Sequence, residues 1–254
     1  MAISPDAEAA EPDEAPPGTG FDTSALWRSG VLHGRRAGRP LRKEQRSRMA
    51  RDLPGLQVDL VALADPHSLF GTSPSGLRLE IGFGGGEHLA REAERCPGVG
   101  FIGCEPFVNG VAKMVEQVEA LHLANVRLHA GDAGEVLDRL PPACLDGVDV
   151  FYPDPWPKRR QRKRRLLSEG TLDRLARVLR GGARFRFATD IDDYSGWVLA
   201  RILRSPHFTW DARAARDWCR PWDGWPSTRY EAKALREGRR PVYLTFVRSA
   251  DGST

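Results

Sequence analysis

The chain has 254 residues, a net charge of +4 at pH 7 and a mean hydropathy of −0.45. At this length it can bury a sizeable core as one large α/β domain or at most two small ones, which excludes a scaffold that needs disulfide or metal staples. It has no run of about eighteen apolar residues and should have no transmembrane helix, and its four widely spaced cysteines predict reduced, buried thiols rather than a redox or zinc site.

The chain opens on two segments of opposite charge. Residues 1–20 contain five acids and no base, a composition typical of a disordered tail and unlike a signal peptide. Removing those five negative charges from the net +4 leaves +9 for the rest of the chain, which favours nucleic acid or acidic lipid as a partner. Residues 21–75 are predicted to form a basic arm, irregular over Trp27–Arg51, where nine bases accompany one acid. The arm is either a solvated charged face or an RNA contact.

From residue 76 to residue 250, short apolar runs alternate with segments of helical spacing, which predicts one domain. The runs expected to form strands are Leu77–Ile81, Gly100–Cys104, Val126–His129, Val148–Tyr152, Arg184–Ala188 and Val242–Val247. The segment that begins FTWDARAARDW is expected to form a strand, a long loop with three tryptophans and a short helix before the final strand. In FVNGVAKMVEQVEALHL the apolar residues from Val108 to Leu121 repeat at threes and fours, and TLDRLARVLRGG ends on a glycine pair, as at a helix C-cap. This alternation predicts an α/β fold with a mostly parallel sheet covered by helices on both faces.

The sequence LRLEIGFGGGEHLA predicts a strand, a glycine-rich turn and a helix start. Gly82 and Gly84 remove side chains where a ligand could approach the backbone. A dinucleotide-binding turn would need a glycine at position 87, where the chain has Glu87. Glu80 at the strand end would repel a pyrophosphate but suit a cationic ligand. A tight turn without any ligand is the alternative.

Acids also follow the next two strands. Glu105 lies at the tip of the second strand, where it could hydrogen-bond ribose hydroxyls, and Asp132 after the third strand could accept from an adenine amino group. Each could instead be a helix N-cap, and Asp132 fits that alternative well. Acids at three successive strand ends favour a ligand with ribose, adenine and positive charge but no phosphate, which describes S-adenosylmethionine.

The fourth strand runs into FYPDPWPKRRQRKRR, from Phe151 to Arg165. Prolines on both sides restrict the backbone around Asp154, which would therefore be held in place at the ligand-binding edge of the sheet. Trp156 offers a face on which a flipped-out base could stack, and the seven bases within Lys158–Arg165 could grip the flanking phosphates. A solvated or nuclear-localisation-like basic run is the alternative.

The sequences LEIGFGGG, GCEPF, GDAGEVL, FYPDPWPK with the KRR that follows it, FATDIDDY and STRYEAKALREGR occur in order between Leu77 and Val247. Together they resemble the tRNA (guanine-N7-)-methyltransferase family, whose fold is similar to other class I methyltransferases. The resemblance implies a seven-stranded Rossmann-like domain that transfers a methyl group from S-adenosylmethionine to N7 of guanosine 46 in the variable loop of tRNA. Family members often have a histidine between the lysine and the KRR, where this chain has Gln161.

Carried over by position, the resemblance implies roles for particular residues. The residues that would bind the cofactor are Glu80, Gly82, Gly84, Glu105, Asp132 and Asp154, and Asp154 would also be the catalytic residue. The residues that would bind the substrate guanosine are Lys158, Asp190, Thr228, Arg229, Tyr230 and Glu231. No metal is expected. We expect a cytoplasmic enzyme that uses neither a membrane nor a partner protein and is a monomer or homodimer.

Three other functions stay open at the level of the sequence. A methyltransferase for exocyclic amines uses a similar proline turn, an RNA-binding module could stand on a decayed methyltransferase scaffold, and a nicotinamide oxidoreductase is disfavoured by the glycine spacing. Near the C-terminus, Trp218, Trp222 and Trp225 lie in a long loop that either lines the base pocket or packs, and packing is favoured.

Overall fold

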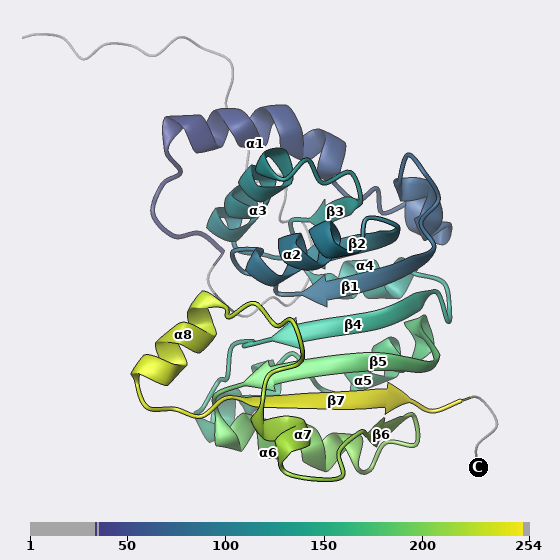
Figure 1. The fold of residues 1–254 in the computed structure, drawn as a ribbon, viewed down its shortest axis with the longest axis vertical. Coiled ribbons are helices and arrows are strands. Elements are labelled where there is room, and N and C mark those ends of the chain that lie inside the picture. Colours follow the sequence, from purple (N-terminus) through teal and green to yellow (C-terminus); the bar gives the residue numbers. More distant parts are fainter. Residues whose placement is uncertain (1–33, 35, 251–254) are drawn as a thin grey trace, which may run out of the picture.

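A seven-stranded sheet forms the centre of the molecule (Figure 1). The computed structural model describes residue 34 and residues 36–250; the predicted acidic tail, residues 1–20, lies outside the described residues, as do residues 21–33 and 35 of the predicted arm. Across the sheet the strands are β3 (Val126–His129), β2 (Val99–Cys104), β1 (Gly76–Ile81), β4 (Leu145–Phe151), β5 (Leu179–Thr189), β7 (Val242–Arg248) and β6 (Phe208–Trp210). All neighbouring pairs are parallel except the two that involve β7. The mostly parallel α/β sheet predicted from the sequence is confirmed.

Helices cover both faces of this sheet. They are α1 (Lys43–Leu56), α2 (Glu87–Arg95), α3 (Val108–Ala120), α4 (Ala133–Arg139), α5 (Glu169–Val178), α6 (Asp192–Ile202), α7 (Arg216–Cys219) and α8 (Arg229–Arg236), with short 3₁₀ turns at Ala62–Ala64, Pro66–Leu69 and Arg159–Arg164. Phe101 packs with α1, α2 and α3, whereas the next residue, Ile102, packs with α4, α5 and α6. Because successive strand residues point to opposite faces, two core layers result, which is why the strands read as mostly apolar runs.

A polar row crosses one face of the sheet, the face that α2 covers. Glu80 of β1 lies opposite Asp149 of β4, which lies opposite Arg186 of β5, and Arg186 lies opposite Thr245 of β7. Residues in register on adjacent strands share a face, so four polar side chains are aligned. The row leads from β1, inside the sheet, across to β7 and toward the C-terminal loop.

The helix pattern corrects several sequence predictions. The arm is not irregular throughout, since α1 begins at Lys43 and buries Met49 and Leu53, one turn apart, against the core. Leu121 follows the last residue of α3 and is exposed, so of the predicted apolar repeat from Val108 to Leu121 only the valines pack.

The glycine pair at 181–182 is not a helix C-cap. Helix α5 ends at Val178, and the next residue, Leu179, already pairs with Leu145 of β4. Strand pairing therefore begins before the glycines, and Gly182 (φ +79°) lies within β5. Of the four cysteines only Cys104 is buried, contrary to the expectation of four buried thiols, and Cys219 is exposed.

Over residues 36–250 every helix is too short or too polar to cross a bilayer.

Candidate active site

A small pocket at the carboxyl edge of the sheet brings together three segments far apart in the sequence. It is lined by Glu80, Gly82, Phe83, Glu87, His88, Phe151, Tyr152, Thr228 and Tyr230. The end of β1 and its glycine turn form one side, the end of β4 another, and the start of α8 the third. Two predicted cofactor residues and two predicted substrate residues therefore meet at one place.

The glycine turn after β1 depends on backbone conformations that side chains disfavour. Gly82 has a φ of +75° and donates its backbone N–H to the carbonyl of Cys104 (2.8 Å). A Cβ at Gly82 would meet no protein atom within 4 Å, so the turn leaves space on that side. Gly84 has a φ of +57°, and its carbonyl lies 2.2 Å from where a Cβ on Gly110 of α3 would stand. Helix α3 therefore approaches the turn at backbone distance.

Glu105, at the tip of β2, holds this turn in place. Its carboxylate accepts hydrogen bonds from the backbone N–H groups of Gly84 (2.6 Å) and Phe107 (2.9 Å). The side chain is buried, and burial raises its pKa against the opposing effect of the two N–H donors. The structure thus assigns Glu105 a role in shaping the turn, while its predicted contact with ribose stays a prediction.

Glu80 is anchored by a residue that the sequence analysis missed. Its Oε2 lies 2.6 Å from Nδ1 of His88, on the first turn of α2, and both side chains are buried. A carboxylate only accepts, so Nδ1 carries the proton of this bond in either charge state of the imidazole. Nε2 of His88 lies 3.3 Å from the guanidinium of Arg186. No spacing rule signals this pair, because the glycine turn alone brings the two side chains together.

Behind His88 lies a buried ion-pair cluster. The Asp149 carboxylate pairs with Arg186 (2.7 Å) and with Arg78 (2.9 Å). Burial alone would raise the pKa of Asp149, but the two guanidinium groups hold it well below its ordinary value. The Arg186 guanidinium also lies 5.1 Å from the ring centre of Trp222, which joins the polar row to the C-terminal loop.

Substitutions at His88 should show whether it positions Glu80. Asparagine places its side-chain N–H near the position of Nδ1 and can still donate to Glu80, whereas glutamine reaches the position of Nε2 and cannot. We expect His88→Gln to weaken S-adenosylmethionine binding about tenfold, the loss of one charge-assisted bond, and His88→Asn to stay within about threefold of wild type. Isothermal titration calorimetry measures both. Equal losses in the two variants would show that Glu80 does not depend on this bond.

Asp132 has the structure of a helix cap. Its Oδ1 accepts from the backbone N–H of Gly134 (2.9 Å) at the start of α4. The cap alternative weighed from the sequence is therefore confirmed, and the predicted contact with an adenine amino group stays a prediction.

The proline turn after β4 carries backbone strain on both sides of Asp154. Tyr152 and Trp156 adopt positive φ angles of +49° and +41°, conformations that large side chains rarely take. Such residues cost about 1–3 kcal/mol each and persist where the surrounding structure imposes them, commonly at functional sites. Asp154 is exposed between them, and its Oδ2 lies 3.0 Å from where a Cβ on Gly34 would stand. Partial desolvation by these neighbours raises the pKa of Asp154.

Arg165 supports this turn instead of gripping phosphate, which corrects the reading of the whole basic run as an RNA contact. Its guanidinium is buried, donates to the Pro155 carbonyl (2.8 Å) and pairs with the carboxylate of Asp193 at the start of α6. It also lies 4.7 Å from the ring centre of Tyr194. Other bases of the run, Lys158 among them, remain exposed.

Of the residues predicted to bind the substrate, some are held in hydrogen bonds or ion pairs within the protein, and others face solvent. Thr228 caps α8 by accepting from the N–H of Glu231 (3.2 Å), and the buried Glu231 accepts from Trp225 Nε1 (2.7 Å) and from the Tyr243 hydroxyl. Asp190, after β5, pairs with Arg239. By contrast Tyr230 is exposed, and the Arg229 guanidinium lies 5.0 Å from its ring centre, beside Gly84. Arg229 makes one long ion pair, with Glu87 (3.9 Å).

The tryptophans of the C-terminal loop pack, as the sequence analysis favoured. Trp222 donates to the Thr245 hydroxyl (2.8 Å), and with Trp225 it packs against Phe151 and Tyr243. Trp218 packs against the main core. The loop therefore closes the end of the polar row.

Comparison with known proteins gives consistent matches. A family model described as "Putative methyltransferase" matches residues 75–244. The chain is 56% identical over 220 residues to a tRNA (guanine-N(7)-)-methyltransferase of Mesorhizobium japonicum, covering 86% of this chain and 94% of the relative. It is 52% identical over 229 residues to the enzyme of the same name from Brucella anthropi, covering 89% and 98%. Among solved structures, the 16S rRNA methyltransferase KamB superposes with a TM-score of 0.50 at 18% identity over 69% of this chain and 89% of that one, which shows likeness of fold.

Proposed function

Because this chain belongs to the tRNA (guanine-N(7)-)-methyltransferase family, we propose that it transfers a methyl group from S-adenosylmethionine to N7 of guanosine 46 in the variable loop of tRNA. The observation that carries the assignment of the reacting site is Asp154, exposed on a strained turn beside the pocket. Among residues 36–250 Asp154 makes no ion pair, whereas Asp190 is held by Arg239 and Glu231 is buried under Trp225. Asp154 is therefore the carboxylate available to a substrate base.

The residues of the pocket fit the methyl donor. The space beside Gly82 admits a ligand against the backbone, and Glu80 and Glu87 add two carboxylates that suit a cationic ligand. The rings of Phe151, Tyr152 and Tyr230 line the same pocket and favour positive charge over their faces. When bound, S-adenosylmethionine supplies the methyl group on a cationic sulfur. We propose that Glu105 and Asp132 lie along the same edge to receive its ribose and adenine.

Methylation at N7 is mainly a problem of positioning. Guanine N7 carries an in-plane lone pair and no proton, so the reaction needs no general base. A carboxylate that accepts from the guanine N1–H and exocyclic amine orients the base and increases electron density at N7. The same charge stabilises the cationic methylated base. Asp154 can supply both effects because the prolines beside it and Arg165 behind it fix its turn.

Available groups on two sides of Asp154 suit the RNA. Lys158 and the exposed part of the basic run follow the turn, and Tyr230 with Arg229 lies across the pocket. We propose that the former hold phosphates and the latter the guanine ring. We also propose that the protein acts in the cytoplasm without a partner protein, as a monomer or homodimer.

The test uses unmodified tRNA transcripts and S-adenosylmethionine labelled on its methyl group. Nucleoside analysis should find N7-methylguanosine, and a transcript with adenosine at position 46 should take up no label. Label on an exocyclic amine would overturn the N7 reaction, and label elsewhere in the tRNA would overturn the position. Binding of tRNA without any methyl transfer would favour an RNA-binding module.

A further inference from the structure

The described part of the basic arm runs directly beside the proline turn. Gly34, the first residue described, lies next to Asp154, whose Oδ2 is 3.0 Å from where a Cβ on Gly34 would stand. From there the chain leads through residues 36–42 to the start of α1. The described part of the arm therefore starts beside the proposed catalytic carboxylate and continues from there to α1.

Backbone contacts fix the course of this segment. The Arg36 carbonyl accepts from the N–H of Val108 (3.0 Å) at the start of α3. Asn109 then bonds the arm twice, accepting from the Gly38 N–H (2.7 Å) and donating to the Arg39 carbonyl (2.8 Å). A Cβ on Gly38 would stand only 2.9 Å from the Phe107 ring, so the arm lies close against the protein there. The main chain is held, which leaves the side chains to face solvent.

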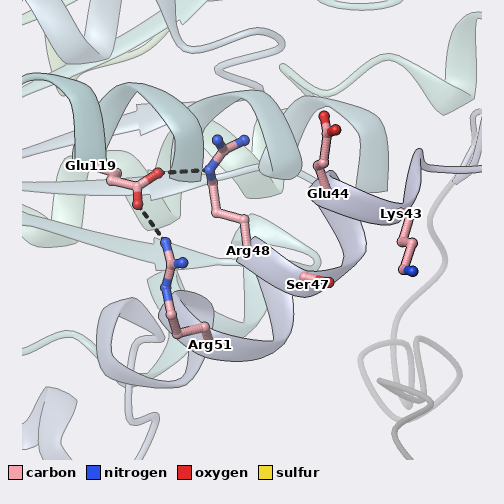
Figure 2. Close-up of a pocket in the computed structure, with 6 residues that line it drawn as sticks. All are labelled: Lys43, Glu44, Ser47, Arg48, Arg51 and Glu119. Carbon is pink, nitrogen blue, oxygen red and sulfur yellow. Dashed lines mark hydrogen bonds and ion pairs between the residues drawn. The ribbon is translucent and has the colours of Figure 1, made fainter.

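Five basic side chains extend from this held backbone, and we name them the arm cations: Arg36, Arg39, Arg42, Lys43 and Arg46. All five are exposed, and none makes an ion pair with another residue of the described chain, 34 and 36–250. The next two arginines behave differently. Arg48 and Arg51 turn to α3 and pair with the Glu119 carboxylate, whereas Lys43 points away from it (Figure 2). Arg48 and Arg51 are thus neutralised by an acid of the same protein, whereas within the described residues the arm cations are not.

We propose that the arm cations bind phosphates of the tRNA next to the methylated guanosine. The proposal rests on the proposed function and adds a second basic surface to the one that follows Asp154. The arm cations form a row of positive charge that no acid of the described chain neutralises, and the row starts beside the proline turn. Such a row suits the RNA backbone, because the guanosine to be methylated must reach Asp154 on that turn. Guanidinium groups on a fixed backbone bind phosphate oxygens with two parallel hydrogen bonds.

The test compares two double variants that each remove two charges from the same segment. Arg39→Gln with Arg42→Gln removes two arm cations, and Arg48→Gln with Arg51→Gln removes two internally paired arginines. The tRNA Kd is measured from about 50 to 200 mM salt, together with kcat, the KM for tRNA and the Kd for S-adenosylmethionine. The arm variant should reduce the slope of log Kd against log salt by roughly 1.4–1.8 and raise the KM for tRNA about tenfold. Its kcat and its affinity for the donor should stay within about twofold of wild type.

The control and rescue variants define the outcomes. The paired-arginine variant should keep the wild-type slope, and Arg39→Lys with Arg42→Lys should restore most of it, because lysine keeps the charge. An unchanged slope in the arm variant, or an equal loss in both glutamine variants, would overturn the proposal while wild-type methylation stands. Failure of the wild-type protein to bind or methylate tRNA would instead overturn the proposed function.

Discussion

Replacement of Asp154 by alanine should lower the kcat of methyl transfer roughly 10²–10³-fold, the usual loss when one preorganised electrostatic group is removed from a reacting site. Asp154 makes no ion pair within residues 36–250, and its side chain is exposed, so the fold should survive its loss. Single-turnover rates at saturating tRNA and S-adenosylmethionine measure the effect. Asp173→Ala, an exposed acid on α5 away from the pocket, is the matched control and should keep wild-type turnover. Near-normal turnover of the Asp154 variant would remove the central assignment.

Asparagine at the same position separates catalysis from stability. Partial desolvation raises the pKa of Asp154 above its ordinary value of 3.8 in the folded protein. The folded state therefore binds this proton more tightly than the unfolded state, so stability falls as pH rises through the raised pKa. At neutral pH the ionised carboxylate is destabilising, and Asp154→Asn should have a melting temperature at least equal to that of wild type. Low turnover combined with a lower melting temperature would indicate a structural role instead.

The fold could be predicted from the sequence because the sheet is buried under helices on both faces. Strands buried on both faces appear as mostly apolar runs, and acids or glycines mark their carboxyl ends. Helix α1 was not predicted because only Met49 and Leu53 of this basic segment are buried. Two apolar positions are too few to reveal a helical period beside so many charges. The end of α5 was misplaced because Leu179 joins β4 before the glycine pair is reached, and strand pairing overrides the local capping signal.

The candidate site was predictable in its location but not in its internal partners. A carboxylate at a strand end is visible in a sequence, yet its hydrogen bonds are not. In the folded chain Glu80 is hydrogen-bonded to His88, Asp190 is paired with Arg239, and Glu231 accepts from Trp225. In the sequence alone nothing distinguishes these acids from Asp154 as candidates to bind a substrate base. The three-dimensional partners distinguish them and leave Asp154 available.

Arg165 provides the second large expected effect, because it is a buried cation hidden in an exposed basic run. Arg165→Met should remove the bond to the Pro155 carbonyl and the pair with Asp193. Losing these charge-assisted contacts should cost about 3 kcal/mol of stability. For a chain of this size that corresponds to a fall in melting temperature of roughly 6–12 °C. The kcat should fall as well, since the turn that carries Asp154 loses its support.

The neighbouring arginine is the matched control for this prediction. Arg164 is exposed and lies 5.1 Å from the Trp156 ring centre, so Arg164→Met should change stability by no more than about 0.5 kcal/mol and should mainly weaken tRNA binding. Arg165→Lys keeps the charge but cannot donate to Pro155 and Asp193 in the same planar geometry, and it should restore part of the stability if the methionine variant does not fold. Differential scanning calorimetry on the three variants measures these differences. If Arg165→Met melts with wild type and Arg165 proves as important for tRNA affinity as Arg164, the buried guanidinium does not hold the turn, and the whole basic run is an RNA contact after all.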